Sequence, residues 1–241
     1  MKFRFWGVRG SIPSPGPRTA RYGGNTTCIE VRTDDDTLIV LDGGTGLFPL
    51  AQHLLARPPV HANIFITHSH WDHIHGLPFF TPLFVKGSRV RLHGAHDPVT
   101  GRGIEHVMGV QLQNSYFPVG ETDMSATIEY CTLTIGEPLA LGDALVANVV
   151  TNHPVTNLGY RIDCNGKSVF FTGDHEPWYN LHAARPPLRC CCPARASTSI
   201  PPADVPHTMT CQFCQDSARR FGRRMVRGCQ YGTATCRGLL P

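Results

Sequence analysis

The stretch THSHWDHIHG, residues 67–76, places four histidines and one aspartate within eight positions. It overlaps the end of NIFIT, residues 63–67, an apolar run with β-branched residues that predicts a buried strand. Side chains at the end of a rigid strand are held in position before any ligand arrives. The spacing H-x-H-x-D-H therefore predicts a metal site directly after a strand, in preference to an exposed loop that merely tolerates histidine.

Two later segments place further ligand candidates after predicted strands. In ALVANVVTNHP the strand is expected to end at His153, because Pro154 cannot continue it. In KSVFFTGDHE the strand is expected to end at Gly173 and to present Asp174. If the three strands share an edge, their ligands meet at one point.

The candidates form two sets of metal ligands, with Asp174 bridging them. The first set has three imidazoles, and the second has one imidazole and two carboxylates: His68, His70 and His153; and Asp72, His73 and Asp174. These donors suit two divalent ions, zinc first and manganese or iron as alternatives. Such ions make hydroxide available near neutral pH, so the pattern predicts hydrolysis, with Asp72 and Asp174 as the catalytic carboxylates.

The composition predicts a single globular domain with a small appendage. The chain has 241 residues, of which 41% are hydrophobic and 17% are charged. No apolar run is long enough for a membrane span, and the first residues, MKFRFWGVRG, lack a signal-peptide core. We expect a cytoplasmic protein. Its oligomeric state stays open, with a homodimer among the alternatives.

Charge divides the chain into two parts near residue 182. Residues 1–182 carry 13 Lys and Arg against 16 Asp and Glu, whereas residues 183–241 carry nine Arg, two Asp and seven of the ten cysteines. We therefore predict a hydrolase domain over 1–182 and a basic tail over 183–241. Because the body is mildly acidic and has no basic stripe, binding of nucleic acid has little support.

The tail admits three interpretations. Its richness in Arg, Cys, Pro and Ser fits a non-native end read from a shifted frame. It also fits a basic disordered arm. The third interpretation is a small zinc module with C-x2-C-x14-C-x6-C spacing, whose second half departs from common zinc ribbons: Cys211, Cys214, Cys229 and Cys236.

Apolar runs bounded by Gly, Pro, Asn and Asp predict a mixed α/β fold in layers. The predicted strands are Lys2–Trp6, Thr27–Arg32, Thr37–Leu41, Asn63–Thr67, Arg89–His93, Leu145–Thr151, Gly159–Asp163 and Ser168–Thr172. Asn165-Gly166 predicts a hairpin between the last two. Helices are expected over Leu47–Ala56, over part of Gly76–Val85 and near residues 100–116.

The motif THSHWDHIHG resembles the HxHxDH signature of the metallo-β-lactamase superfamily. RFWGVRGSIPSPGP, RYGGNTTC and LIVLDGGTGL resemble its cyclic-phosphodiesterase-like and phosphoribosyl-phosphodiesterase-like branch, to which RNase Z is related. The resemblance covers residues 1–180. It implies a four-layer αββα sandwich with the metal site at one edge of the two sheets, and it implies the two ligand sets given above. It also implies that Asp42 orients a metal-binding histidine without binding the metal itself.

The chain departs from this branch after Asn180. Members of the branch continue with further strands, helices and a late histidine that completes the second metal site, so the sandwich is expected to be incomplete at its C-terminal end. His207 has no strand before it and is not expected to replace that ligand.

We therefore predict a metal-dependent phosphodiesterase that takes a small or cyclic phosphodiester as its substrate. The alternatives are an RNA-processing nuclease or a lactonase or thioesterase of the same fold, and an inactive, truncated metal-binding relic.

Overall fold

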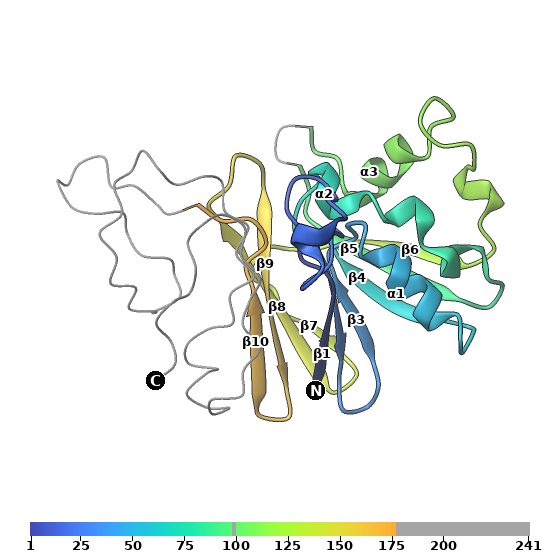
Figure 1. The fold of residues 1–241 in the computed structure, drawn as a ribbon. Helices are drawn as coiled ribbons and strands as arrows, with labels where there is room; N and C mark the ends of the chain where they lie inside the picture. Colours follow the sequence, from blue (N-terminus) through green and yellow to red (C-terminus); the bar gives the residue numbers. More distant parts are fainter. Residues whose placement is uncertain (98–99, 177–241) are drawn as a thin grey trace.

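The computed structural model describes residues 1–97 and 100–176. The predicted boundary at residue 182, the basic tail and its cysteine pattern lie outside these residues. Within residues 1–97 and 100–176, ten strands form two sheets, and three α-helices and four 3-10 helices connect them (Figure 1). No helix in this part of the chain is long and apolar enough to cross a membrane.

The first sheet has six strands in sequence order, β1 to β6. The β1–β2 and β2–β3 pairs are antiparallel, and β3 to β6 are parallel. The bounds of its strands are β1 Lys2–Gly7, β2 Cys28–Arg32, β3 Leu38–Leu41, β4 His61–Phe65, β5 Arg89–Gly94 and β6 Thr127–Thr132.

The second sheet has four antiparallel strands in the order β10-β9-β8-β7. Asn165 and Gly166 both have positive φ, 47° and 72°, in the tight turn between β9 and β10, which confirms the predicted hairpin. The bounds of its strands are β7 Leu139–Leu141, β8 Ala144–Thr151, β9 Asn157–Cys164 and β10 Lys167–Phe171.

The two longer helices, α1 and α3, lie on one face of the six-stranded sheet, and the four-stranded sheet covers the other face (Figure 1). The α-helices are α1 Leu47–Leu54, α2 Trp71–Ile74 and α3 Ile104–Gln111. The 3-10 helices are η1 Pro17–Thr19, η2 Leu77–Phe79, η3 Thr81–Phe84 and η4 Glu121–Asp123.

Strand alternation gives the six-stranded sheet two apolar faces. Even-numbered residues such as Val40 and Ile64 pack under the helices, and odd-numbered residues such as Ile39 and Phe65 pack against the second sheet. The hydroxyl of the fully buried Tyr160 donates a 2.6 Å hydrogen bond to the Ile66 carbonyl and ties the two sheets together. The mixed α/β layered fold is therefore confirmed.

The described residues supply three of the four expected layers. No helix within residues 1–97 and 100–176 lies on the outer face of the four-stranded sheet (Figure 1). Leu145 and Val149 on that face are 43% and 41% exposed.

One local prediction is confirmed in a different form, and two strands were missed. The helical part of Gly76–Val85 consists of two 3-10 helices and no α-helix, because Pro78 and Pro82 each occupy a first turn. Strand β6 was missed because it is a half-buried edge strand whose sequence, TIEYCT, has no clear apolar alternation. Strand β7 was missed because it has only three residues.

Candidate metal centre

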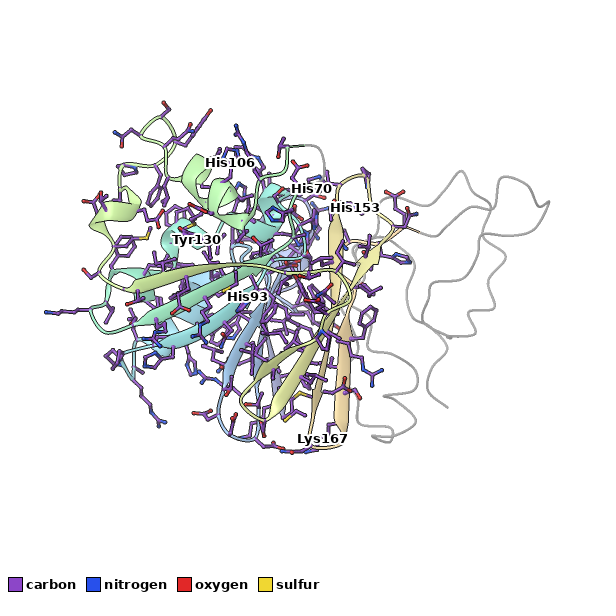
Figure 2. All side chains as sticks on the ribbon, turned by 180° about the vertical axis from the view of Figure 1, so that it is seen from behind. His70, His93, His106, Tyr130, His153 and Lys167 are labelled. Carbon is purple, nitrogen blue, oxygen red and sulfur yellow. The ribbon has the colours of Figure 1, made fainter. Side chains whose placement is uncertain are left out.

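The predicted ligands come from both sheets and meet at one end of the sandwich. His68 follows β4 in the first sheet, whereas His153 and Asp174 follow β8 and β10 in the second. The strands therefore do not share an edge of one sheet, and face-to-face packing of the two sheets brings their ends together. Figure 2 shows His70 and His153 side by side at this end, opposite Lys167 at the hairpin end.

The motif after β4 changes conformation halfway. His70 is extended, with φ −62° and ψ 147°, so that His68 and His70 point to the same side of the chain. Asp72 and His73 follow on the short helix α2, which the sequence analysis did not predict. Because the chain changes here from extended to helical, the side chains of His68 and His70 point in one direction and those of Asp72 and His73 in another.

In the first cluster, three imidazole nitrogens and one carboxylate oxygen lie within 4.8 Å of one another. They belong to His68, His70, His153 and Asp174. The Nδ1 atom of His70 lies 2.9 Å from His68 Nε2 and 3.1 Å from His153 Nε2. Asp174 Oδ2 lies 3.8 Å from His68 Nε2 and 3.9 Å from His153 Nε2. The structure thus brings together the predicted first ligand set and Asp174.

The second cluster is centred on the Nε2 atom of His73. This atom lies 3.4 Å from Asp72 Oδ2 and 3.4 Å from Asp174 Oδ1. The two oxygens of Asp174 therefore face the two clusters separately, with Oδ2 toward the first and Oδ1 toward the second.

Asp42 contacts the His73 ring on the side away from the second cluster. Its Oδ2 atom lies 2.7 Å from His73 Nδ1, and its Oδ1 atom accepts hydrogen bonds from the Thr67 backbone N–H and hydroxyl at 2.8 and 2.9 Å. Both Asp42 and His73 are fully buried. Donation from Nδ1–H to Asp42 leaves the Nε2 lone pair directed at the second cluster.

The local chain geometry brings Asp42 to this place. Asp42 has φ +62°, a conformation that Asp tolerates better than most residues, and it directly follows β3. The next residue, Gly43, donates its N–H to the carbonyl of His73 at 2.7 Å. The turn after β3 therefore holds helix α2 as well as the side chain of His73.

The pKa values of three proposed ligands depart from their ordinary values in different directions. Burial lowers the pKa of His73, but Asp42 and the carboxylates near Nε2 outweigh burial and raise it well above its ordinary value. Burial, helped by the neighbouring imidazoles, lowers the pKa of His68 far below its ordinary value. Burial raises the pKa of Asp72, but His73 and the Ser11 N–H outweigh it and hold that pKa at about 2.

The donor sets fit divalent metal ions. Four donors at 2.0–2.1 Å from a zinc ion would lie about 3.3 Å apart, close to most separations within both clusters. His73 Nε2 and Asp174 Oδ1 are buried and have no hydrogen-bond partner among the described residues. A cation between them would take the place of the Nε2 proton that the surrounding carboxylates favour, and would satisfy these buried polar atoms.

Three residues that contact the proposed ligands were not predicted from the sequence. The backbone N–H of Ser11 donates a 2.7 Å hydrogen bond to Asp72 Oδ2. The hydroxyl of Thr67 lies between Asp42 and His68, and the buried amide of Asn157 contacts the carbonyl of Asp174. Thr67 begins the histidine motif and Ser11 lies within RFWGVRGSIPSPGP, so both could have been found, whereas no local signal marks Asn157.

Two further histidines pack against aromatic rings. His93 is in β5, stacked on Phe65 with ring centroids 4.3 Å apart. His75 packs edge-on against Trp71. Neither belongs to the predicted ligand sets.

A cleft of about 490 Å³ opens beside the first cluster. His68 and His153 line one end of it, and its other walls come from the segments after β5 and β8 and from the start of α3. Val150, Val155 and Arg102 are exposed in this lining. The cleft therefore combines apolar walls with the guanidinium group of Arg102 and the carboxylate of Asp97.

Comparison with known proteins places this arrangement in a family. Residues 37–187, more than half of the chain, match the beta-lactamase superfamily domain. Ribonuclease Z of Staphylococcus epidermidis is 27% identical over 173 residues, which cover 68% of this chain and 49% of that protein. The chain thus spans about half the length of the curated relatives that it matches.

Solved structures show the same fold. The metallo-beta-lactamase fold protein YhfI from Bacillus subtilis superposes with a TM-score of 0.51 at 22% identity, covering 74% of this chain and 63% of that one. The short form of human tRNase Z superposes with a TM-score of 0.51 at 17% identity, covering 72% and 69%. Given the matched domain and this shared fold, the chain belongs to the metallo-β-lactamase superfamily of metal-dependent hydrolases.

Proposed function

We propose that this chain is a metal-dependent phosphodiesterase that acts on small or cyclic phosphodiesters. The observation that carries the proposal is the Asp174 carboxylate, whose two oxygens face two separate donor clusters. Two cations held by one carboxylate suit in-line displacement at phosphorus, because the attacking and leaving oxygens both gain negative charge.

The ligand assignments are part of the proposal. The first ion would bind the three imidazoles of His68, His70 and His153, and the second would bind Asp72 and His73, with Asp174 shared. When bound, divalent ions such as zinc would acidify a water molecule and offset charge on the phosphoryl oxygens. Asp72 and Asp174 are the carboxylates next to the reacting atoms.

Other side chains of the protein prepare this site. Asp42 holds the Nδ1 proton of His73, so that Nε2 stays available as an electron-pair donor. The Ser11 N–H occupies one lone pair of Asp72 Oδ2 and fixes the rotation of that carboxylate. Burial keeps His68 neutral, which is the form that binds a cation.

The cleft supports a small substrate. Its volume of about 490 Å³ accommodates an organic group the size of a nucleoside beside the scissile phosphate. Apolar surface of Val150 and Val155 would face that group, and Arg102 would favour a further negative charge on it.

Turnover with a defined metal content tests the proposal. We expect hydrolysis of bis(p-nitrophenyl) phosphate and of cyclic nucleotides by zinc- or manganese-loaded protein, and loss of both activities in excess chelator. No metal-dependent turnover of either substrate contradicts the proposal. Hydrolysis of a lactone or a thioester in its place would assign the site to acyl chemistry, and a protein that binds no metal would be an inactive relic.

A nuclease is the second candidate, and its support is the likeness to Ribonuclease Z of Staphylococcus epidermidis. Binding of RNA releases counterions, so its affinity falls steeply with salt. Cleavage of a structured RNA, together with binding that weakens between 50 and 200 mM salt, on the scale that is typical of nucleic-acid binding, would favour the nuclease. Turnover of small diesters without RNA binding favours the phosphodiesterase.

A further inference from the structure

Asn157 is the first residue of β9, and its side chain is fully buried where three ligand-bearing segments meet. The next residue, Leu158, donates its backbone N–H to the carbonyl of Thr67 at 2.9 Å, directly before His68. Asn157 thus starts its strand beside the chain that leaves β4 and between the ends of β8 and β10.

The amide nitrogen of Asn157 holds the segment that carries Asp174. The Nδ2 atom lies 2.9 Å from the carbonyl oxygens of Thr172 and Asp174, and it also contacts the hydroxyl of Thr151 at the end of β8. A buried amide fixes such neighbours because separating them would leave polar groups without partners. Its two N–H groups therefore join the end of β10 to the end of β8.

The amide oxygen of Asn157 faces the opposite way, toward the chain of the first histidine. A Cβ atom on Gly173 would lie 2.7 Å from Asn157 Oδ1 and 2.9 Å from the Thr67 side chain. Gly173, with φ +61°, therefore permits the close approach of Asn157 and Thr67 that a larger residue would block.

This oxygen is buried and has no hydrogen bond of normal geometry with the described residues. One amide thus holds the Asp174 backbone with its nitrogen, and its oxygen faces Gly173, beside the chain that leads into His68.

We propose that Asn157 is a positioning residue of the metal centre, which sets the separation between the Asp174 carboxylate and the His68 imidazole. This inference rests on the ligand assignments of the proposed function. The two ligands belong to different sheets. The Asn157 side chain holds the Asp174 segment, and the backbone N–H of the next residue, Leu158, holds Thr67 directly before His68. Loss of the amide would therefore loosen the donor set without removing a donor.

Asn148 offers a matched control. It is also a buried asparagine, 7% exposed, and lies on the neighbouring strand β8. Its Nδ2 atom donates to the carbonyls of Thr134 and Glu137, and its Oδ1 atom accepts from the N–H of Gly136. Replacing Asn148 therefore removes a buried amide that contacts none of the proposed ligands.

The test measures zinc affinity by competition with a chromophoric chelator, and thermal unfolding of the metal-free protein, for wild type, Asn157→Leu and Asn148→Leu. Both variants keep the branched heavy-atom framework and the net charge of the side chain. We expect both to lower thermal stability, and only Asn157→Leu to weaken zinc binding, by about 10- to 100-fold. If Asn157→Leu does not fold, Asn157→Ser retains one donor and is expected to show a smaller loss of affinity.

Several outcomes separate the proposals. Wild-type zinc affinity in the folded Asn157 variant, or an equal loss of affinity in Asn148→Leu, overturns the positioning role. If wild type binds zinc but does not hydrolyse diesters, the proposed function is wrong. The comparison of zinc affinities then still tests the positioning role of Asn157. A wild-type protein that binds neither zinc nor manganese overturns both.

Discussion

The Oδ1 atom of Asp174 lies 3.4 Å from Nε2 of His73, a nitrogen that is buried and has no hydrogen-bond partner among the described residues. The Oδ2 atom of the same carboxylate lies 3.8 Å from His68 Nε2. One side chain therefore touches two donor clusters that otherwise come from different local structures, an extended segment and a short helix. Its charge is the feature on which a two-ion site depends most.

Asp174→Asn keeps the volume of the side chain and removes its charge. We expect loss of the second metal ion and a fall in diester hydrolysis of more than about 100-fold, because among the described residues only Asp72 and His73 remain as donors of that ion. His68, His70 and His153 should retain the first ion. Elemental analysis and turnover of bis(p-nitrophenyl) phosphate measure both effects, and two retained ions with normal turnover would show that Asp174 is only a turn residue.

His70→Ala and Asp72→Ala should affect different ions. His70 Nδ1 contacts the other two imidazoles of the first cluster, so its loss should abolish binding of the first ion. Asp72 lies beside His73, so its loss should weaken the second ion more than the first. Calorimetric titration with zinc distinguishes the two. His61→Ala, an exposed histidine at the start of β4, is the control. The same binding defect in His70→Ala and Asp72→Ala would contradict two separate clusters.

His93→Phe should make the stability of the fold less dependent on pH. Burial, together with Arg91, lowers the pKa of His93 to about 4, below the ordinary value of about 6.5, and neither ring nitrogen has a partner among the described residues. The neutral ring is therefore favoured in the folded state. Its stabilising effect is complete above about pH 6.5 and is lost as the pH falls toward 4, a change of about 3 kcal/mol.

Urea unfolding of wild type and His93→Phe at several values between pH 7 and pH 4 measures this difference. Other titrating groups contribute to both proteins and cancel in the comparison. Parallel curves for the two proteins would show that His93 takes up its proton equally well in the folded and unfolded states.

Arg102→Gln should weaken the binding of substrates that carry a second negative charge. Arg102 lines the cleft beside the first cluster, and loss of a charge-assisted contact there should raise KM about fivefold for such a substrate. The ratio of kcat/KM for diesters with and without an extra phosphate measures the effect. Arg89→Gln, at the opposite end of β5 and paired with Glu129, is the control. An unchanged ratio in Arg102→Gln would remove Arg102 from the substrate site.

Local sequence patterns were enough for much of the fold. The run NIFIT predicted a buried strand, which the structure places at His61–Phe65, and Asn165-Gly166 predicted a turn because those residues accept positive φ. The spacing of the histidine motif predicted a metal site and the superfamily. These features depend on backbone preferences and side-chain chemistry within about ten residues, which a sequence carries directly.

Only the tertiary structure decided how the candidate ligands are oriented. That Asp174 faces His73 with one oxygen and His68 with the other follows from the packing of two sheets, because no spacing within the chain relates the end of β10 to the end of β4. The Ser11 N–H reaches Asp72 across 61 positions of sequence. Asn157 likewise gains its contacts from strand ends that meet only after the sheets stack. Distances between segments that are remote in sequence depend on how the core packs, and short-range propensities contain no record of that packing.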